Sequence, residues 1–227
     1  MISGFTIYND DILDRDMPSK QFCFDIDDTI SDLMGLVINE YNKKYNTSYS
    51  LDDIETWDFW GKFGTWSYIL RELVTQKDLY SKMLPFEKTK EIIDGLKDKY
   101  QILFVTSRFT NAVDLTKAWF DQNEIFYDSI HFDWYKSYFA KLFHIEYFVD
   151  DSLENSIKIA KNSDKTKVFL LDKPWNRDKE INRLIENDIF TKEQVEHAMK
   201  KITRITSINE IPNLIKMKNI KNSLKIK

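Results

Sequence analysis

The sequence has few of the residues that cross-link or interrupt a chain, and it has no long apolar run. Cys23 is the one cysteine among 227 residues, so no disulfide can form within the chain and a zinc site built on cysteines would lack ligands. Only five glycines and four prolines occur, so turns must rely on Asn, Asp and Ser. A membrane-spanning helix needs roughly 18 consecutive apolar residues, and no such run exists. The first residues show no basic leader followed by an apolar stretch, and we therefore expect no secretory signal and a reducing, cytoplasmic setting.

The charge of the chain is close to balanced. The 33 basic and 37 acidic residues give a net charge of -4, so the chain has no overall attraction for nucleic acid or for anionic membranes. Apolar residues make up 42% of the sequence and aromatic residues 15%, which is enough to build the packed core of one domain.

Short apolar runs alternate with segments that have helical spacing. The expected strands are residues 21–26, 101–105, 129–132, 145–149 and 167–171. The expected helices are residues 32–45, 87–100, 110–122, 137–143 and 152–162. This alternation predicts an α/β fold in which a parallel sheet carries helices on both faces.

Residues 31–85 differ from the rest of the chain, because they are rich in aromatic residues and contain no buried-strand run. We interpret them as a small helical cap inserted over the sheet edge, with residues 1–30 and 86–215 forming the α/β core. The lysine-rich residues 216–227 are expected to form a frayed tail.

Polar residues follow three of the expected strands, at the point where each strand ends. They are Asp25 and Asp27, then Thr106, Ser107 and Arg108, and then Asp150 and Asp151. Carboxyl ends of parallel strands meet at one edge of a sheet, so these groups should converge. Paired carboxylates suit a hard divalent cation or a nucleophile beside a general acid, and the hydroxyl and guanidinium groups suit a phosphate. Each group alone could be a helix cap or a turn, but jointly they favour a phosphate site.

With these motifs, the sequence resembles the haloacid-dehalogenase (HAD) superfamily of phosphohydrolases. FCFDIDDTI matches its first motif, ILFVTSR its second, and YFVDDS its fourth. The third motif is a lysine upstream of the acid pair, for which Lys136 and Lys141 are candidates. We prefer Lys136, because it would begin the short helix and the N-terminus of a helix favours anions.

Over residues 20–215 the sequence is similar to the cytosolic 5'(3')-deoxyribonucleotidase family and its bacterial and phage relatives, mainly through VFLLDKPWNR. The resemblance implies a HAD-like Rossmannoid core and an enzyme that hydrolyses nucleoside monophosphates. It implies that Asp25 forms an aspartyl-phosphate while Asp27 is the general acid and base. Mg²⁺ would be held by Asp25, the Asp27 backbone carbonyl and Asp151, with Asp150 close by.

The resemblance also assigns phosphate binding to Thr106 and Lys136, with Ser107 as a helper. Arg108 is either a further phosphate contact or a surface arginine. Four aromatic residues of the cap either stack on a nucleobase or form the core of the cap: Trp57, Phe59, Trp60 and Trp66.

We expect a small-molecule nucleotide as the partner, no stable binding of nucleic acid, and no membrane association, and a homodimer is compatible with the sequence. Three alternatives remain open: a HAD phosphatase of a sugar phosphate, a phosphatase of nucleic-acid 3'-ends, and a HAD scaffold used only for binding. The histidines His131, His144 and His197 have no metal-ligand spacing, and we interpret them as structural or solvated.

Overall fold

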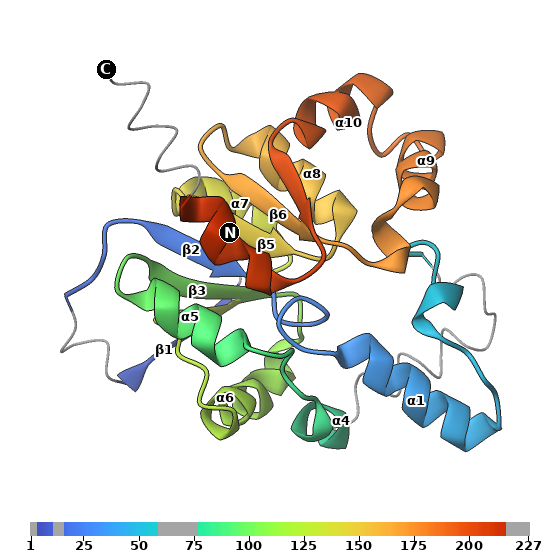
Figure 1. Cartoon of the computed structure of the whole chain (residues 1–227), viewed down its shortest axis with the longest axis horizontal. Helices are drawn as coiled ribbons and strands as arrows, with labels where there is room; N and C mark the ends of the chain where they lie inside the picture. Colours follow the sequence, from blue (N-terminus) through green and yellow to red (C-terminus); the bar gives the residue numbers. More distant parts are fainter. Residues whose placement is uncertain (1–3, 11–15, 59–76, 217–227) are drawn as a thin grey trace.

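A seven-stranded sheet forms the centre of the computed structural model, which describes residues 4–10, 16–58 and 77–216 (Figure 1). The strands are β1 (Phe5–Tyr8), β2 (Gln21–Phe24), β3 (Gln101–Thr106), β4 (Ser129–Phe132), β5 (Tyr147–Asp150), β6 (Lys167–Leu171) and β7 (Ile202–Ile205). Their order in the sheet is β1-β4-β3-β2-β5-β6-β7. The strands β2 to β7 all run parallel, which places their carboxyl ends at one edge.

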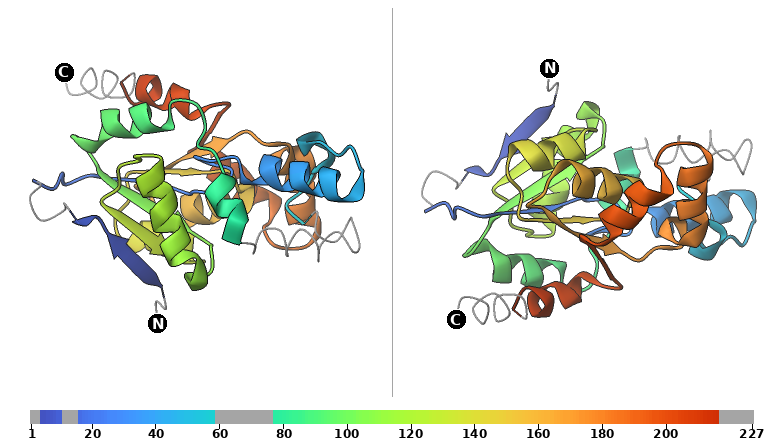
Figure 2. Two further views of the ribbon diagram at one scale, coloured as in Figure 1. Left: turned by 90° about the horizontal axis from the view of Figure 1, so that it is seen from below. Right: turned by 90° about the horizontal axis from the view of Figure 1, so that it is seen from above.

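Helices cover both faces of this sheet, as Figure 2 shows from below and from above. The α-helices are α1 (Leu33–Tyr45), α4 (Lys77–Lys82), α5 (Thr89–Lys97), α6 (Val113–Gln122), α7 (Lys136–Leu142), α8 (Leu153–Asn162), α9 (Asp178–Glu186) and α10 (Lys192–Met199). Short 3-10 turns are η2 (Leu51–Asp53), η3 (Thr110–Ala112), η4 (Pro174–Asn176) and η5 (Ile208–Glu210). One apolar cluster packs α1, α4, α5 and α6 with one face, and a second packs α7, α8, α9 and α10 with the other.

The predicted α/β class is confirmed, and each of the five expected strands is present within two residues of its expected ends. Two further strands were not predicted. Strands β1 and β7 lie at the two edges of the sheet, where FTIY and ITRI are partly exposed and read as no apolar run. The sheet is also not wholly parallel, because β1 pairs antiparallel with β4. Edge strands have one neighbour and need less apolar surface, which explains why both escaped the sequence pattern.

The central strand β2 sets the position of the polar residues that follow it. Phe24 pairs with Phe104 of β3 on one side and with Val149 of β5 on the other. The backbone N–H of Asp25 then donates to the Val149 carbonyl at 2.9 Å, which continues the pairing by one residue. The ends of β2, β3 and β5 therefore lie side by side.

Helices α1 and α4 belong to the segment between β2 and β3, and Figure 1 shows α1 reaching beyond the carboxyl end of β2. The division into a cap of residues 31–85 and a core stays a prediction. Phe59, Trp60 and Trp66 lie outside the described residues, and so does the expected tail beyond residue 216. Within the described ranges, no helix is both long and apolar enough to cross a membrane.

Candidate active site

Three buried carboxylates meet where β2 and β5 end. Asp25 directly follows β2, Asp150 is the last residue of β5, and Asp151 follows it. Each offers an oxygen that lies within 4.8 Å of those of the other two. The chain turns away after Asp151 because Ser152 caps α8, its side chain accepting the backbone N–H of Asn155.

Lys136, the first residue of α7, lies against two of these carboxylates. Its Nζ is 2.7 Å from Asp25 Oδ2 and 3.0 Å from Asp150 Oδ2, and its side chain is 3% exposed. Lys141 is exposed in the last turn of the same helix, away from the cluster. Of the two candidate lysines, the structure therefore brings only Lys136 to the site.

The cluster carries more negative charge than its buried surroundings compensate. Burial raises the pKa of Asp25 to about 7, with Lys136 opposing and Asp150 adding to the shift. Burial and the charge of Asp150 likewise raise the pKa of Asp151. Burial alone would lower the pKa of Lys136, but Asp150 and Asp25 hold it above its ordinary value, so the ammonium stays charged.

This donor set fits a divalent cation. Among the described residues, Lys136 is the only cation that forms an ion pair with any member of the cluster, which leaves an excess of negative charge. Carboxylate oxygens are the ligands that hard divalent cations prefer, and such an ion would relieve the repulsion. Asp25, Asp150 and Asp151 are therefore the residues that could hold a metal.

Asp27 faces a different cation. Arg108 donates from Nε to Asp27 Oδ2 at 2.9 Å and from a terminal nitrogen to Asp27 Oδ1 at 2.6 Å, so the pair is bidentate. The guanidinium is buried, lies 4.2 Å from the centre of the Tyr80 ring, and donates to Thr116 Oγ1 at 3.0 Å. Arg108 is thus neither a surface arginine nor free to turn toward a phosphate without leaving Asp27.

Thr106 and Ser107 lie at the end of β3, beside β2. Thr106 is fully buried, and its Oγ1 accepts the backbone N–H of Arg108 at 3.1 Å, which shapes the turn out of the strand. Ser107 is half-buried. The register of β2 and β3 puts this turn next to Asp25, and hydroxyls and backbone N–H groups there can receive a phosphate.

Two residues that contact the cluster were not among the predicted site residues. The indole Nε1 of Trp175 donates to Asp151 Oδ2 at 2.9 Å, and Thr29 Oγ1 donates to Asp151 Oδ1 at 3.4 Å. Both belong to sequence motifs quoted above, FCFDIDDTI and DKPWN. The motifs carried the signal, but a tryptophan offers a single donor and no acceptor or ionisable group, so it was not chosen as a site residue.

Trp57 is half-buried and packs on Trp175, with ring centres 6.3 Å apart. Its backbone N–H donates to the buried carboxylate of Glu180 at 3.0 Å. Of the four predicted base-stacking aromatics it is the one within the described residues, and here it joins the segment after α1 to the core.

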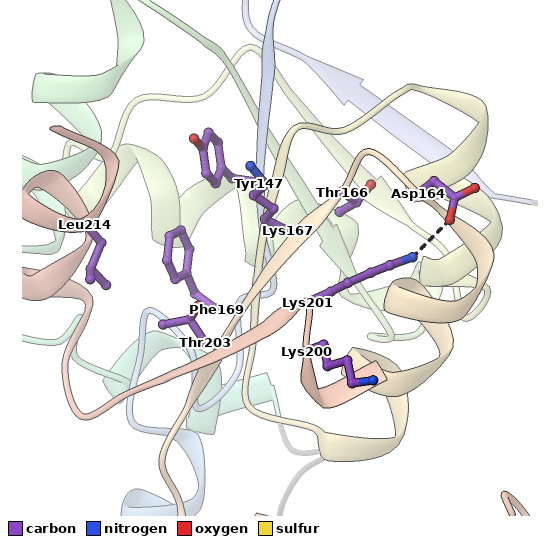
Figure 3. A pocket seen from close by; sticks show the side chains of 9 residues that line it. All are labelled: Tyr147, Asp164, Thr166, Lys167, Phe169, Lys200, Lys201, Thr203 and Leu214. Atoms are coloured by element: carbon purple, nitrogen blue, oxygen red, sulfur yellow. Dashed lines mark hydrogen bonds and ion pairs between the residues drawn. The ribbon is translucent and has the colours of Figure 1, made fainter. Parts of the chain in front are cut away.

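A pocket of about 320 Å³ lies elsewhere, at the opposite edge of the sheet (Figure 3). Tyr147 and Lys167, the first residues of β5 and β6, line it together with Phe169 and Lys201. Lys201 is bound to Asp164 there. Because this pocket is at the amino ends of the strands, it is separate from the carboxylate cluster.

Known relatives have nucleotidase names. A protein of Bacillus subtilis with a provisional nucleotidase name, YqfW, is 28% identical over 157 residues, covering 67% of this chain and 80% of the relative. A nucleotidase of Clostridium acetobutylicum is 27% identical over 184 residues, covering 74% of this chain and 88% of the relative.

A solved structure confirms the fold. A haloacid dehalogenase-like protein of unknown function from Agrobacterium tumefaciens superposes with a TM-score of 0.55 at 11% identity, over 88% of this chain and 99% of that one. The family model described as 5' nucleotidase, deoxy (pyrimidine), cytosolic type C protein matches residues 20–218. The chain has the fold of the haloacid dehalogenase-like proteins and belongs to this nucleotidase family.

Proposed function

We propose that this chain is a Mg²⁺-dependent phosphomonoesterase that hydrolyses (deoxy)ribonucleoside monophosphates through an aspartyl-phosphate. The observation that carries the proposal is the contact of Asp25 with Lys136 inside the cluster of Asp25, Asp150 and Asp151, in a chain of a nucleotidase family. The Asp25 carboxylate can attack a phosphorus atom, because the ammonium of Lys136 beside it offsets the negative charge of the phosphate oxygens.

The reaction requires two displacements at phosphorus. In the first, an oxygen of Asp25 bonds to phosphorus while the bond to the ribose oxygen breaks, and Asp27 gives that oxygen a proton. In the second, water attacks the aspartyl-phosphate, Asp27 takes a proton from the water, and Asp25 is released with inorganic phosphate. Each step leaves Asp27 ready for the other, so the cycle needs no further proton donor.

The nucleophile must be ionised to attack. With a pKa raised to about 7, Asp25 is partly protonated near neutrality. A divalent cation bound by Asp25 and Asp151, with Asp150 close by, would lower that pKa and offset the charge between carboxylate and phosphate. The part of the Asp27 backbone carbonyl in holding the ion stays a prediction.

Arg108 supports this scheme by fixing Asp27 in its carboxylate form, the form that takes the proton from water, and one of the two bonds must open when Asp27 holds the proton that it gives to the ribose oxygen. Its two N–H donors match both oxygens of Asp27, and a bidentate fork holds a carboxylate in one plane. We assign Arg108 to the orientation of Asp27 rather than to a direct phosphate contact. Thr106 and Lys136, with Ser107, are the groups proposed to hold the non-bridging oxygens.

Trp57 is proposed to lie near the nucleoside, since stacking on an aromatic ring contributes about 1–3 kcal/mol per base. Phe59, Trp60 and Trp66 stay predictions in this role. The same holds for a small-molecule nucleotide as the partner, the absence of stable nucleic-acid binding, a homodimer and a cytoplasmic location.

Phosphate release from a panel of nucleoside monophosphates and sugar phosphates tests the substrate class. We expect nucleoside monophosphates to have the higher kcat/KM. A sugar phosphate that wins by tenfold, about 1.4 kcal/mol, would instead make the chain a phosphatase of another small phosphomonoester.

The covalent step has its own test. Asp25→Asn should abolish turnover while circular dichroism shows an intact fold, because the amide cannot attack phosphorus. In the wild-type protein, brief mixing with a labelled substrate followed by an acid quench should trap label on Asp25. Residual turnover of more than about one part in a thousand of the wild-type rate would contradict covalent catalysis, whose removal costs far more.

A further inference from the structure

The segment DKPWN holds Asp151 in a way that differs from its two neighbours in the cluster. Asp25 and Asp150 share the charge of Lys136, whereas within the described residues Asp151 receives only uncharged donors. Trp175 donates to one oxygen of its carboxylate and Thr29 to the other. Neutral donors fix the direction of a carboxylate but leave its negative charge available.

Trp175 is itself held rigidly. The residue is 1% exposed, and its ring packs on Trp57. The next residue, Asn176, donates from Nδ2 to the carbonyls of Asp151 and Leu171, both at 2.7 Å. Arg204 of β7 donates to the Asn176 carbonyl at 2.8 Å. The turn that carries the Trp175 indole is therefore also hydrogen-bonded, through Asn176, to the backbone of Asp151, whose carboxylate the indole orients.

We propose that Trp175 is a positioning residue for the metal: its indole N–H fixes the Asp151 carboxylate so that the cluster is preorganised for a divalent cation. The inference rests on the metal site of the proposed function. A carboxylate that is free to rotate would lose that freedom on binding the ion, which weakens binding. Residues that hydrogen-bond to a metal-ligating side chain commonly contribute about 10- to 100-fold to metal affinity.

Trp175→Phe removes the N–H and keeps an aromatic ring. We expect the Kd for Mg²⁺, measured by titration calorimetry on the metal-free protein without substrate, to rise by about 10- to 100-fold. Because no substrate is present, this result does not depend on which phosphate ester the enzyme prefers. A failed substrate panel would thus leave the measurement intact.

Trp119→Phe is the matched control. Trp119 is also buried, and its Nε1 also makes one hydrogen bond, 2.7 Å to the carbonyl of Met83, outside the cluster. If Trp175 is only a packing residue, both variants will lower the melting temperature and neither will change the Kd. That outcome would overturn the proposal, as would a wild-type protein that binds no divalent cation.

A second replacement covers the case in which Trp175→Phe does not fold. Placing 3-benzothienylalanine at position 175 exchanges the N–H for sulfur and preserves the size of the ring. The same weakening of Mg²⁺ binding, with a melting temperature close to that of the wild type, would support the inference. An unchanged Kd in a folded protein would contradict it.

Discussion

Lys136 and Arg108 reach the same edge of the sheet but serve different carboxylates. Lys136 bridges Asp25 and Asp150, whereas Arg108 forms a bidentate pair with Asp27. A compact ammonium can neutralise two carboxylates at once, while a planar guanidinium holds one carboxylate in a fixed plane. The ammonium thus offsets charge around the proposed nucleophile, and the guanidinium holds Asp27 in the carboxylate form, in which it acts as the base.

Arg108→Lys should impair both proton transfers proposed for Asp27, the one to the leaving ribose oxygen and the one from the attacking water. A lysine retains the charge but cannot hold Asp27 by two parallel bonds. We expect kcat for a nucleoside monophosphate to fall by about 10- to 100-fold, a part of what a general acid contributes. The first displacement with p-nitrophenyl phosphate, whose leaving group needs no proton, should be far less affected, and the rate of p-nitrophenol release in the first turnover after rapid mixing measures it separately from the second displacement.

KM and inhibition by inorganic phosphate distinguish the orientation of Asp27 by Arg108 from a direct contact of Arg108 with the phosphate. If Arg108 binds the phosphate directly, Arg108→Lys will weaken inhibition by inorganic phosphate and will slow the first displacement of both substrates equally. Thr116→Val is the control for a change in the surroundings, since it removes the bond from Arg108 to the Thr116 hydroxyl and the bond from that hydroxyl to the Ala112 carbonyl, but leaves both bonds from Arg108 to Asp27.

At the residue scale, the sequence indicated which side chains lie together where a charged residue follows a buried strand. Asp25, Asp150 and Asp151 are such residues, and they converge. Choosing between Lys136 and Lys141 required the helix to be placed, because the two lysines differ in which end of α7 they occupy. Trp175 could not be assigned, because the partner of an indole N–H depends on tertiary packing.

At the scale of elements, buried strands were predictable and edge elements were not. The runs KVFLL and QILFV are covered on both faces, so they are continuously apolar and stand out. Strand β7 and helices α9 and α10 were missed. Strand β7 is the last strand on its side of the sheet, and its sequence ITRI mixes apolar with charged residues. The sequence of α9, DKEINRLIE, does the same.

Helix α9 joins the segment after α1 to the core through one buried acid. Glu180 is fully buried, accepts the Trp57 N–H, and is held by Arg183 through bonds of 2.8 and 2.7 Å. Removing the charge of a buried, paired group leaves its partner uncompensated. The element therefore depends on Glu180 more than on any exposed pair.

Glu180→Gln should lower the free energy of unfolding by about 2–4 kcal/mol, near or somewhat below the usual cost of breaking a buried pair because Arg183 is partly exposed. Chemical denaturation measures the change. Glu40→Gln is the matched control, since its pair with Lys43, also three residues apart on one helix, is more exposed and should cost less than about 1 kcal/mol. Equal losses in the two variants would show that the buried pair has no special weight.

At the scale of the whole molecule, the buried acids make stability depend on pH. Burial raises the pKa of Asp28, as of Asp25, to about 7. In the unfolded chain both titrate near 3.8, so between these values the folded state holds protons that the unfolded state has lost. In the absence of metal, the contribution of these two acids to stability is therefore fully present below pH 3.8 and is lost as pH rises toward 7.

Asp28→Asn isolates this effect. Its backbone φ of 57° lies in the left-handed region, which asparagine tolerates, and an amide oxygen can still accept the Met34 N–H. In EDTA, the variant should gain stability relative to wild type between pH 5 and 8, at about 1.4 kcal/mol for each pKa unit. Melting temperatures across that range, read by circular dichroism, measure the gain.

Burial lowers the pKa of His131 to about 4. Its opposing contribution cancels when the stability of the wild type is subtracted from that of the variant. That histidine alone would make the protein more stable as pH rises from about 4 to 6.5, and it is present in both. Added Mg²⁺ should flatten the wild-type decline. A variant that is not stabilised at pH 8 in EDTA would contradict the raised pKa of Asp28.

The pairing of β2 with β5 sets the position of Asp25 relative to Asp150 and Asp151. Phe24 and Val149 are opposite one another, and the backbone N–H of Asp25 donates to the Val149 carbonyl. One residue inserted into either strand would shift the two reacting ends by about 3.3 Å and turn Asp25 or Asp151 to the wrong face. The same insertion before Gln21, where β2 begins, would leave the carboxylate oxygens of Asp25 and Asp151 in place. Tolerance to insertion should therefore end abruptly where β2 begins.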